Sequence, residues 1–191
     1  MQRDRVLIPV EGLRLAALGI LASRGPMDYA TLATAVRLFA TSYGASPVDV
    51  MSSSIELLRF EGLIAIGDDG EDAGSARVTL MPGGREELER LMLAPVRVSS
   101  ASSRLMVALK IRFFRLLDTT GQRRLAEVLG DTLRSERARL VNLRRHMEGE
   151  EPGFLAWLDR DIARTVEELA WLEGEEALMT RQRQRDDDTP T

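Results

Sequence analysis

A helix followed at once by a β-hairpin within residues 46–84, and three long amphipathic segments after residue 103, predict a mainly α-helical fold. The first pattern is the layout of a winged helix-turn-helix, in which three helices are followed by a hairpin wing. The second predicts an antiparallel helical domain that serves for dimerisation. We therefore expect a winged helix-turn-helix domain in residues 1–93, a linker in 94–103, a helical dimerisation domain in 104–179 and a flexible tail in 180–191.

Residues 46–62 carry the signals of a single amphipathic helix. Ser46 suits the N-cap, and Pro47 suits the first helical position, where its missing N–H costs nothing. Gly62 closes the helix. The apolar positions recur at spacings of four and three residues and form one face: Met51, Ile55 and Leu58.

A β-hairpin is expected directly after this helix. Residues 63–66 and 76–81 are short apolar or alternating runs, and the polar loop between them contains three glycines. This composition suits a mobile hairpin. A Pro-Gly stop at residues 82–83 is expected to end the second strand, and a short helix over residues 86–93 leads away from it.

Two earlier segments complete the N-terminal domain. Residues 11–23 are strongly apolar and contain Arg14 as their only basic residue, which predicts a largely buried first helix that ends at the Gly25-Pro26 step. Asp28 can cap a second helix over residues 29–40. A short turn then leads to the helix described above.

Three helices are expected in the C-terminal half: residues 104–117, 122–147 and 154–179. Asp118 or Thr119 can cap the second, whose apolar stripe has a polar gap at Glu136. These apolar faces need a partner, and the simplest partner is a second copy of the chain in a two-fold dimer. The expected dimer contacts lie on the last helix: Leu155, Trp157, Leu158, Ile162, Val166, Leu169, Trp171 and Leu172.

The two tryptophans are fourteen residues apart and therefore lie on nearly the same side of the last helix. One interpretation is that Trp157 and Trp171 are large anchors of the dimer interface, where aromatic residues are enriched. The alternative is that they line a pocket for a flat aromatic effector. The sequence leaves both interpretations open.

The composition is that of an ordinary globular protein, with 44% hydrophobic and 29% charged residues. The net charge is −4, and residues 1–92 hold nine arginines against thirteen acidic residues. This balance opposes tight non-specific binding to DNA, because the neutralisation of phosphates supplies most of that affinity. It does not oppose specific binding, which depends on the local field of one face.

An enzyme is disfavoured by the residues that the chain lacks. It has no cysteine, one histidine, no nucleotide-binding glycine loop and no serine-centred nucleophile elbow. His146 has no second histidine or cysteine with which to hold a metal, so we expect neither a metal nor a cofactor. No apolar run approaches about 18 residues and the N-terminus has no signal-peptide core, which indicates a cytoplasmic protein without a membrane span.

Four motifs occur in a characteristic order. They are a Gly-Pro turn after the first helix, a tyrosine that opens the second, a Glu-Gly-Leu-Ile step after the third, and a Leu-x-x-x-Gly step after the wing. Here these are Gly25-Pro26, Tyr29, Glu61-Gly62-Leu63-Ile64 and Leu80-Met81-Pro82-Gly83-Gly84. In order and spacing they resemble the PadR family of bacterial winged-helix transcription regulators, over roughly residues 11–179.

The resemblance implies that the third helix and the wing bind double-stranded DNA. Serine hydroxyls can bond to phosphates or base edges, glutamate can accept from cytosine N4, and arginine suits guanine or phosphate. The alternative is that these are solvated polar residues of an amphipathic helix. The expected DNA-binding residues are Ser46, Asp49, Ser52, Ser53, Glu56, Arg59 and Arg77.

Two departures from the family pattern keep a second function open. The family's recognition helix commonly has Leu-Tyr-Pro where this chain has Met51-Ser52-Ser53, and the wing tip at residues 67–74 has four acidic residues where family wings are basic. We expect a dimeric, ligand-responsive repressor that binds a pseudo-palindromic operator. The alternative is a winged-helix dimer that has lost DNA binding and acts as a protein-interaction module or an antagonist of another regulator.

Overall fold

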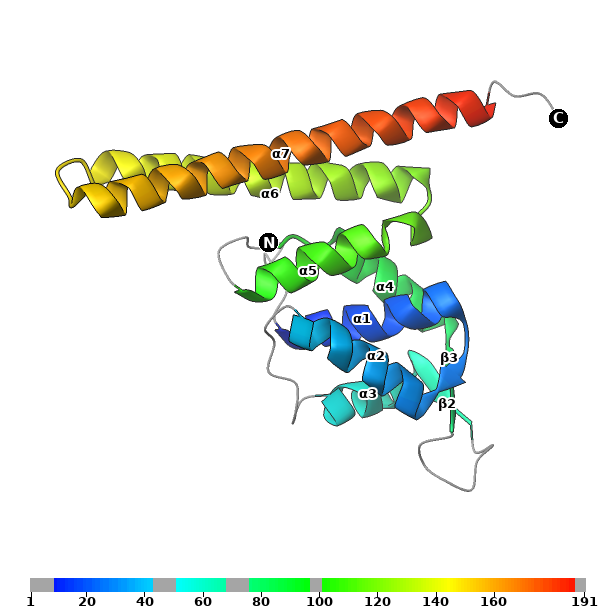
Figure 1. The fold of residues 1–191 in the computed structure, drawn as a ribbon. Coiled ribbons are helices and arrows are strands. Elements are labelled where there is room, and N and C mark those ends of the chain that lie inside the picture. Colours follow the sequence, from blue (N-terminus) through cyan, green and yellow to red (C-terminus); the bar gives the residue numbers. More distant parts are fainter. Residues whose placement is uncertain (1–8, 43–50, 68–75, 97–100, 188–191) are drawn as a thin grey trace, which may run out of the picture. The chain divides into compact units, whose positions relative to one another are not determined.

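The computed structural model describes residues 9–42, 51–67, 76–96 and 101–187, with the side chains of 11–42, 55–67, 76–96 and 105–174. Within these ranges the chain is mainly helical and has a small three-stranded antiparallel sheet (Figure 1). This confirms the predicted fold class, a winged helix followed by a helical region. The chain divides into two compact units, residues 1–125 and 126–191.

The first unit is built around α1 (Pro9–Arg24). Nearly every side chain from Glu11 to Leu21 is buried, and those of Leu15 and Leu18 are fully buried. A helix that is apolar on all sides must be enclosed, and α1 is in contact with the sheet and with the helices around it. The predicted buried first helix is confirmed, and it ends at Gly25, where φ is 81°.

Two more helices and the sheet complete the winged helix: α2 (Tyr29–Ser42), α3 (Met51–Phe60), β1 (Met27–Asp28), β2 (Ile64–Ile66) and β3 (Arg77–Leu80). The strand order is β1-β3-β2, with Met27 opposite Val78 and Ile64 opposite Leu80. β2 and β3 are the predicted hairpin. The sequence did not predict β1, because two residues are too few to show an alternating pattern.

The second strand of the wing ends at Leu80, before the predicted Pro-Gly stop, but the following helix, α4 (Pro82–Leu93), begins at this step and not at residue 86, with Met81 as its N-cap. Proline is favoured in the first turn of a helix, since the N–H that it lacks would have no intrahelical partner. The first turn packs closely on the wing. A Cβ atom at Gly84 would lie 2.1 Å from the carbonyl oxygen of Leu63, so this position requires glycine.

The next helix, α5 (Ala101–Arg112), begins inside the predicted linker and packs in the first unit. Phe113, just before the 3-10 turn η1 (Phe114–Leu116), lies directly over α1, where a Cβ atom at Gly19 would be 2.3 Å from its ring. Packing therefore carries the first unit to Leu125, whereas the predicted boundary lies in residues 94–103.

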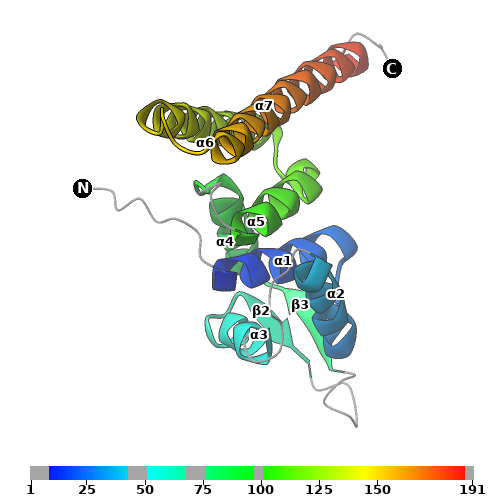
Figure 2. The ribbon, with the colours of Figure 1, turned by 60° about the vertical axis from the view of Figure 1, so that its left-hand side comes forward.

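Two long antiparallel helices, α6 (Thr119–His146) and α7 (Pro152–Asp187), lie side by side in both views (Figures 1 and 2) and form a hairpin. The second unit holds this hairpin except for the first residues of α6, up to Leu125. Asp118, one of the two predicted caps, accepts a 2.7 Å hydrogen bond from the Gly121 N–H at the start of α6. α7 runs to Asp187 and so includes most of the tail that the sequence places at residues 180–191. The added segment has no glycine or proline that would end a helix.

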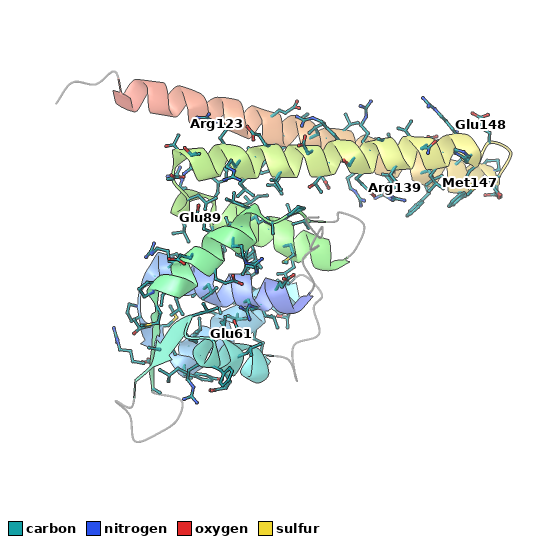
Figure 3. The ribbon with its side chains drawn as sticks, turned by 180° about the vertical axis from the view of Figure 1, so that it is seen from behind. Glu61, Glu89, Arg123, Arg139, Met147 and Glu148 are labelled. Atoms are coloured by element: carbon teal, nitrogen blue, oxygen red, sulfur yellow. The ribbon has the colours of Figure 1, made fainter. Side chains whose placement is uncertain are left out.

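An apolar seam and two ion pairs hold the hairpin together. Leu140 of α6 and Leu158 of α7 are buried. Arg144 pairs with Asp159 at 3.0 Å, and Arg134 pairs with Glu173 at 3.4 Å, which fits the antiparallel register of the two helices. At the predicted polar gap, Glu136 accepts hydrogen bonds from Arg139, whose guanidinium lowers the pKa of the Glu136 carboxyl. Arg139 projects from α6 in Figure 3.

Candidate nucleic-acid interface

α3 packs on the core by one face and leaves the other face open. Ile55 and Leu58 are 2% and 0% exposed, and they are two of the three residues of the predicted apolar stripe. The exposed positions on the described part of α3 are Glu56, Leu57, Arg59 and Phe60. In a winged helix the third helix is the element that enters the major groove, so this open face is the candidate interface.

The C-terminal end of α3 leads without a gap into the wing. The Gly62 N–H donates to the Arg59 carbonyl and the Leu63 N–H donates to the Leu58 carbonyl, both at 2.9 Å. Gly62 has a φ of 71°, which a residue with a side chain rarely adopts. The predicted helix end at Gly62 is confirmed, and it sets the direction in which β2 leaves the helix.

The structure tests few of the predicted DNA contacts. Ser46 and Asp49 lie outside the described residues, and Ser52 and Ser53 lie on α3 without described side chains. Their contacts with DNA stay predictions. The three residues with described side chains, all exposed, are Glu56, Arg59 and Arg77.

The charges on the described part of α3 are already partnered. The Arg59 Nε lies 3.1 Å from Glu56 Oε2, in a pair in which both side chains are about half exposed. Exposed pairs of this kind stabilise a protein little, so Arg59 can exchange Glu56 for a phosphate at small cost. Burial, together with the charge of Glu56, raises the pKa of the Tyr29 hydroxyl at the start of α2.

The sequence interpretation missed two apolar residues on the open face. Leu57 is 41% exposed and Phe60 is 88% exposed. Neither residue lies on the apolar stripe of Ile55 and Leu58. Their positions in the sequence could therefore have predicted that both are exposed. Apolar side chains can contact the methyl group of thymine in the major groove, or they can contact another protein.

A second candidate surface lies on α7. Leu158 is fully buried within its own chain, and four other members of the predicted dimer stripe are half-buried: Leu155, Ile162, Leu169 and Leu172. Much of this stripe is therefore covered within its own chain, and its predicted dimer contacts stay a prediction. On the part of α7 whose side chains are described, the large apolar residues that remain exposed are Phe154, Trp157, Val166 and Trp171.

The spacing of the two tryptophans limits the predicted effector pocket. α7 is continuous through both, and a rise of about 1.5 Å per residue places Trp157 and Trp171 about 21 Å apart along its axis. One small flat molecule cannot contact both rings of the same chain. The Trp157 ring also stacks on Phe154, with their centroids 6.3 Å apart.

Among the described residues, no group of three or more histidine, cysteine, aspartate or glutamate side chains is arranged to hold a metal ion. None of the helices in the described part of the chain combines the length and the apolar character needed to cross a membrane.

The family model described as "Putative AphA-like transcriptional regulator" matches residues 2–176. Two solved structures of Bacillus subtilis PadR, with and without p-coumaric acid, are each 18% identical to the chain and cover 92% of it and 99% of their own length, with TM-scores of 0.37 and 0.38 respectively. No curated protein sequence matches the chain. Because the family model spans nearly all of the chain, this protein belongs to the AphA-like transcriptional regulators, whose winged helix is of the PadR type.

Proposed function

We propose that the protein is a homodimeric repressor that works in the cytoplasm and binds a pseudo-palindromic operator through α3 and the wing. The observation that carries this proposal is the open face of α3 in a complete winged helix, where Ile55 and Leu58 are buried and the opposite side chains are exposed. Membership of a family of transcription regulators supports the same function.

The exposed face of α7 supports the dimer. Trp157 and Trp171, which lie on nearly the same side of α7, are 54% and 49% exposed, and a second surface that covers both would remove this apolar area from water. A second copy that covers them gives a two-fold assembly. Such an assembly presents two α3 helices to half-sites about one DNA turn apart, roughly 34–36 Å.

Regulation by a flat aromatic effector is the finer part of the proposal. Since Trp157 and Trp171 of one chain are too far apart to share a ligand, the effector site is built from one tryptophan and a surface of the second copy. Binding there then changes the dimer, and the dimer sets the spacing of the two α3 helices.

A salt titration of binding to duplex DNA from upstream of the protein's own gene tests the operator proposal. We expect saturable binding that weakens as salt rises, because arginines displace counterions from phosphates. Arg59→Ala should lower the salt slope by about one, and Ser53→Asp should abolish binding by repulsion. Arg137→Ala, which removes an exposed arginine of the hairpin, is the matched control and should change the affinity less than about twofold.

A second candidate function is a protein-interaction module without DNA binding. The specific observation in its favour is the exposure of Phe60 and Leu57 on the same face where Arg59 is occupied by Glu56. Absence of salt-sensitive binding to any upstream fragment would overturn the operator proposal. A stoichiometric protein partner whose binding is lost in Phe60→Ala would then support the module.

A further inference from the structure

Arg14 is a charged residue in the middle of an apolar helix. Its α1 neighbours Leu13 and Leu15 are buried, and the Arg14 side chain itself is only 13% exposed. Removing an arginine from water in this way is costly unless its hydrogen bonds are satisfied. We therefore expect partners for the hydrogen-bond donors of the Arg14 guanidinium.

Arg14 joins the C-terminal end of α3 to α4. Its two terminal nitrogens bond in parallel to the two carboxylate oxygens of Glu61, with Nη1 3.0 Å from Oε1. Nη2 also reaches Glu87 Oε1 at 3.3 Å. Glu87 in turn accepts hydrogen bonds from Arg90 Nε and Nη2 at 2.6 and 2.8 Å. The result is an alternating chain of charges, Glu61-Arg14-Glu87-Arg90, which we name the Arg14 clasp.

The two end residues of the clasp, Arg90 and Glu61, differ in the elements that they connect. Arg90 is about half exposed and bonds to a residue of its own helix, three positions away. Glu61 follows the last residue of α3, in the turn that leads to the wing (Figure 3). A carboxylate at the C-terminal end of a helix is disfavoured by the helix dipole, so the guanidinium of Arg14 offsets a charge that α3 alone would not favour. The bond to Glu61 is the main reason that the pKa of Arg14 is raised.

The geometry of this contact is directional. A bidentate arginine–carboxylate pair fixes distance and orientation together, whereas an apolar contact of similar size allows the helix to slide or roll. Replacement of partly buried ion pairs by apolar residues is often neutral for stability. The main effect of this ion pair is therefore to fix the position and orientation of the C-terminal end of α3.

We infer that Arg14 is a positioning residue that fixes the orientation of α3 for operator reading, with Glu87 and Arg90 fixing Arg14 in turn. This inference rests on the proposed operator-binding function. It assigns a role in recognition to an α1 residue that faces the inside of the winged helix.

Arg14→Met and Arg90→Met in the full-length chain form a matched pair of variants. Each removes one arginine from the clasp, but only the first removes the contact with α3. We expect Arg14→Met to weaken binding to the upstream DNA at least tenfold at a temperature where both variants are folded, and Arg90→Met to weaken it less than twofold. Arg14→Lys keeps the positive charge but loses the planar fork that bonds to both oxygens of Glu61, so this variant should also bind the DNA more weakly than wild type.

Hydrogen exchange of the backbone amides gives a measurement that needs no DNA. We expect the last turn of α3 to exchange at least fivefold faster in Arg14→Met than in Arg90→Met, with α2 unchanged in both. If wild type binds no DNA, the proposed function and the role of Arg14 in recognition both fail, and the exchange comparison still decides whether Arg14 fixes the end of α3. Wild-type affinity in a folded Arg14→Met variant, or equal exchange in the two variants, overturns the inference.

Discussion

The two units of the chain differ in how they cover their apolar surface. In the first, α1 is enclosed and the buried side chains come from every helix around it. In the second, two helices share one seam, and Trp157, Val166 and Trp171 remain in water on α7. The first unit therefore encloses its apolar core, whereas the hairpin keeps large apolar side chains exposed on the described part of α7. The comparison predicts that core changes matter most in the first unit and association changes matter most in the second.

The largest effect should come from the contact between α4 and the wing. Gly84→Ala places a Cβ atom against the backbone of Leu63, which cannot move without shifting β2, and should lower the free energy of unfolding by about 3 kcal/mol. Gly83→Ala is the matched control, because the nearest atom to its Cβ is a flexible leucine methyl at 3.7 Å. Urea unfolding of the two variants measures the difference, and equal stabilities would show that the first unit is less tightly packed than we describe.

Lys110 is the most deeply buried charge among the described side chains, with 0% exposure. Its Nζ donates to the carbonyl oxygens of Leu91, Met92 and Ala94 at the C-terminal end of α4. Lys110→Met leaves these acceptors without a donor and should cost about 2 kcal/mol in the free energy of unfolding. Chemical denaturation at pH 9 measures this cost, because below pH 7 the folded chain also has to bury a charged ammonium, and a neutral result would mean that water replaces the amine.

The same residue should make stability depend on pH. Burial lowers the pKa of Lys110 from 10.5 to about 7 in the folded chain. Between these values the unfolded chain keeps a proton that the folded chain has released, so the free energy of unfolding rises with pH, by up to about 1.4 kcal/mol per pH unit. The measurement is the difference in unfolding free energy between wild type and Lys110→Met from pH 7 to 9. A constant difference would mean that the three carbonyl oxygens hold the ammonium form.

In the hairpin, the expected effect is on association. Trp171→Glu places a charge on the exposed face of α7 and should weaken dimerisation at least tenfold, because a buried aromatic anchor is lost. Leu38→Glu is the control, since Leu38 is a 69% exposed leucine of the first unit. Sedimentation of both variants at several concentrations gives the dimer dissociation constants. A wild-type chain that is monomeric at micromolar concentration would remove the basis of the comparison.

The sequence predicted the helices better than it predicted the contacts between distant parts of the chain. Periodic apolar residues locate α1, α2, α6 and the start of α7 within a few positions, because burial on one face leaves a repeat that can be counted. The sequence pattern could not assign α5 to the first unit, because the contact between Phe113 and Gly19 joins positions that are far apart in the chain. The opening of α4 was also missed, because Pro82 can either end a strand or begin a helix.

The candidate site was less predictable than the fold. The spacing of Ile55 and Leu58 predicts the buried face of α3. The DNA contacts were predicted from polar residue types, which selected Glu56 and Arg59 and left out the exposed Phe60. Arg14 stands out in the sequence as the one basic residue of an apolar segment. Its partners Glu61 and Glu87 do not, because they lie 47 and 73 positions further along the chain.

The smallest effect should come from the ion pairs that cross the hairpin. Arg144 and Asp159 are 30% and 57% exposed, so water screens their attraction, and Arg144→Met should change the free energy of unfolding by no more than about 0.5 kcal/mol. Glu136→Gln is the informative comparison. The Glu136 side chain is only 14% exposed and its carboxylate accepts two hydrogen bonds from Arg139, so its loss should cost about 1 kcal/mol. Thermal unfolding at dimer-saturating concentration measures both. If Arg144→Met proves the more damaging, surface ion pairs hold the hairpin together more than its leucine seam does, and the contrast between the two units is smaller than burial implies.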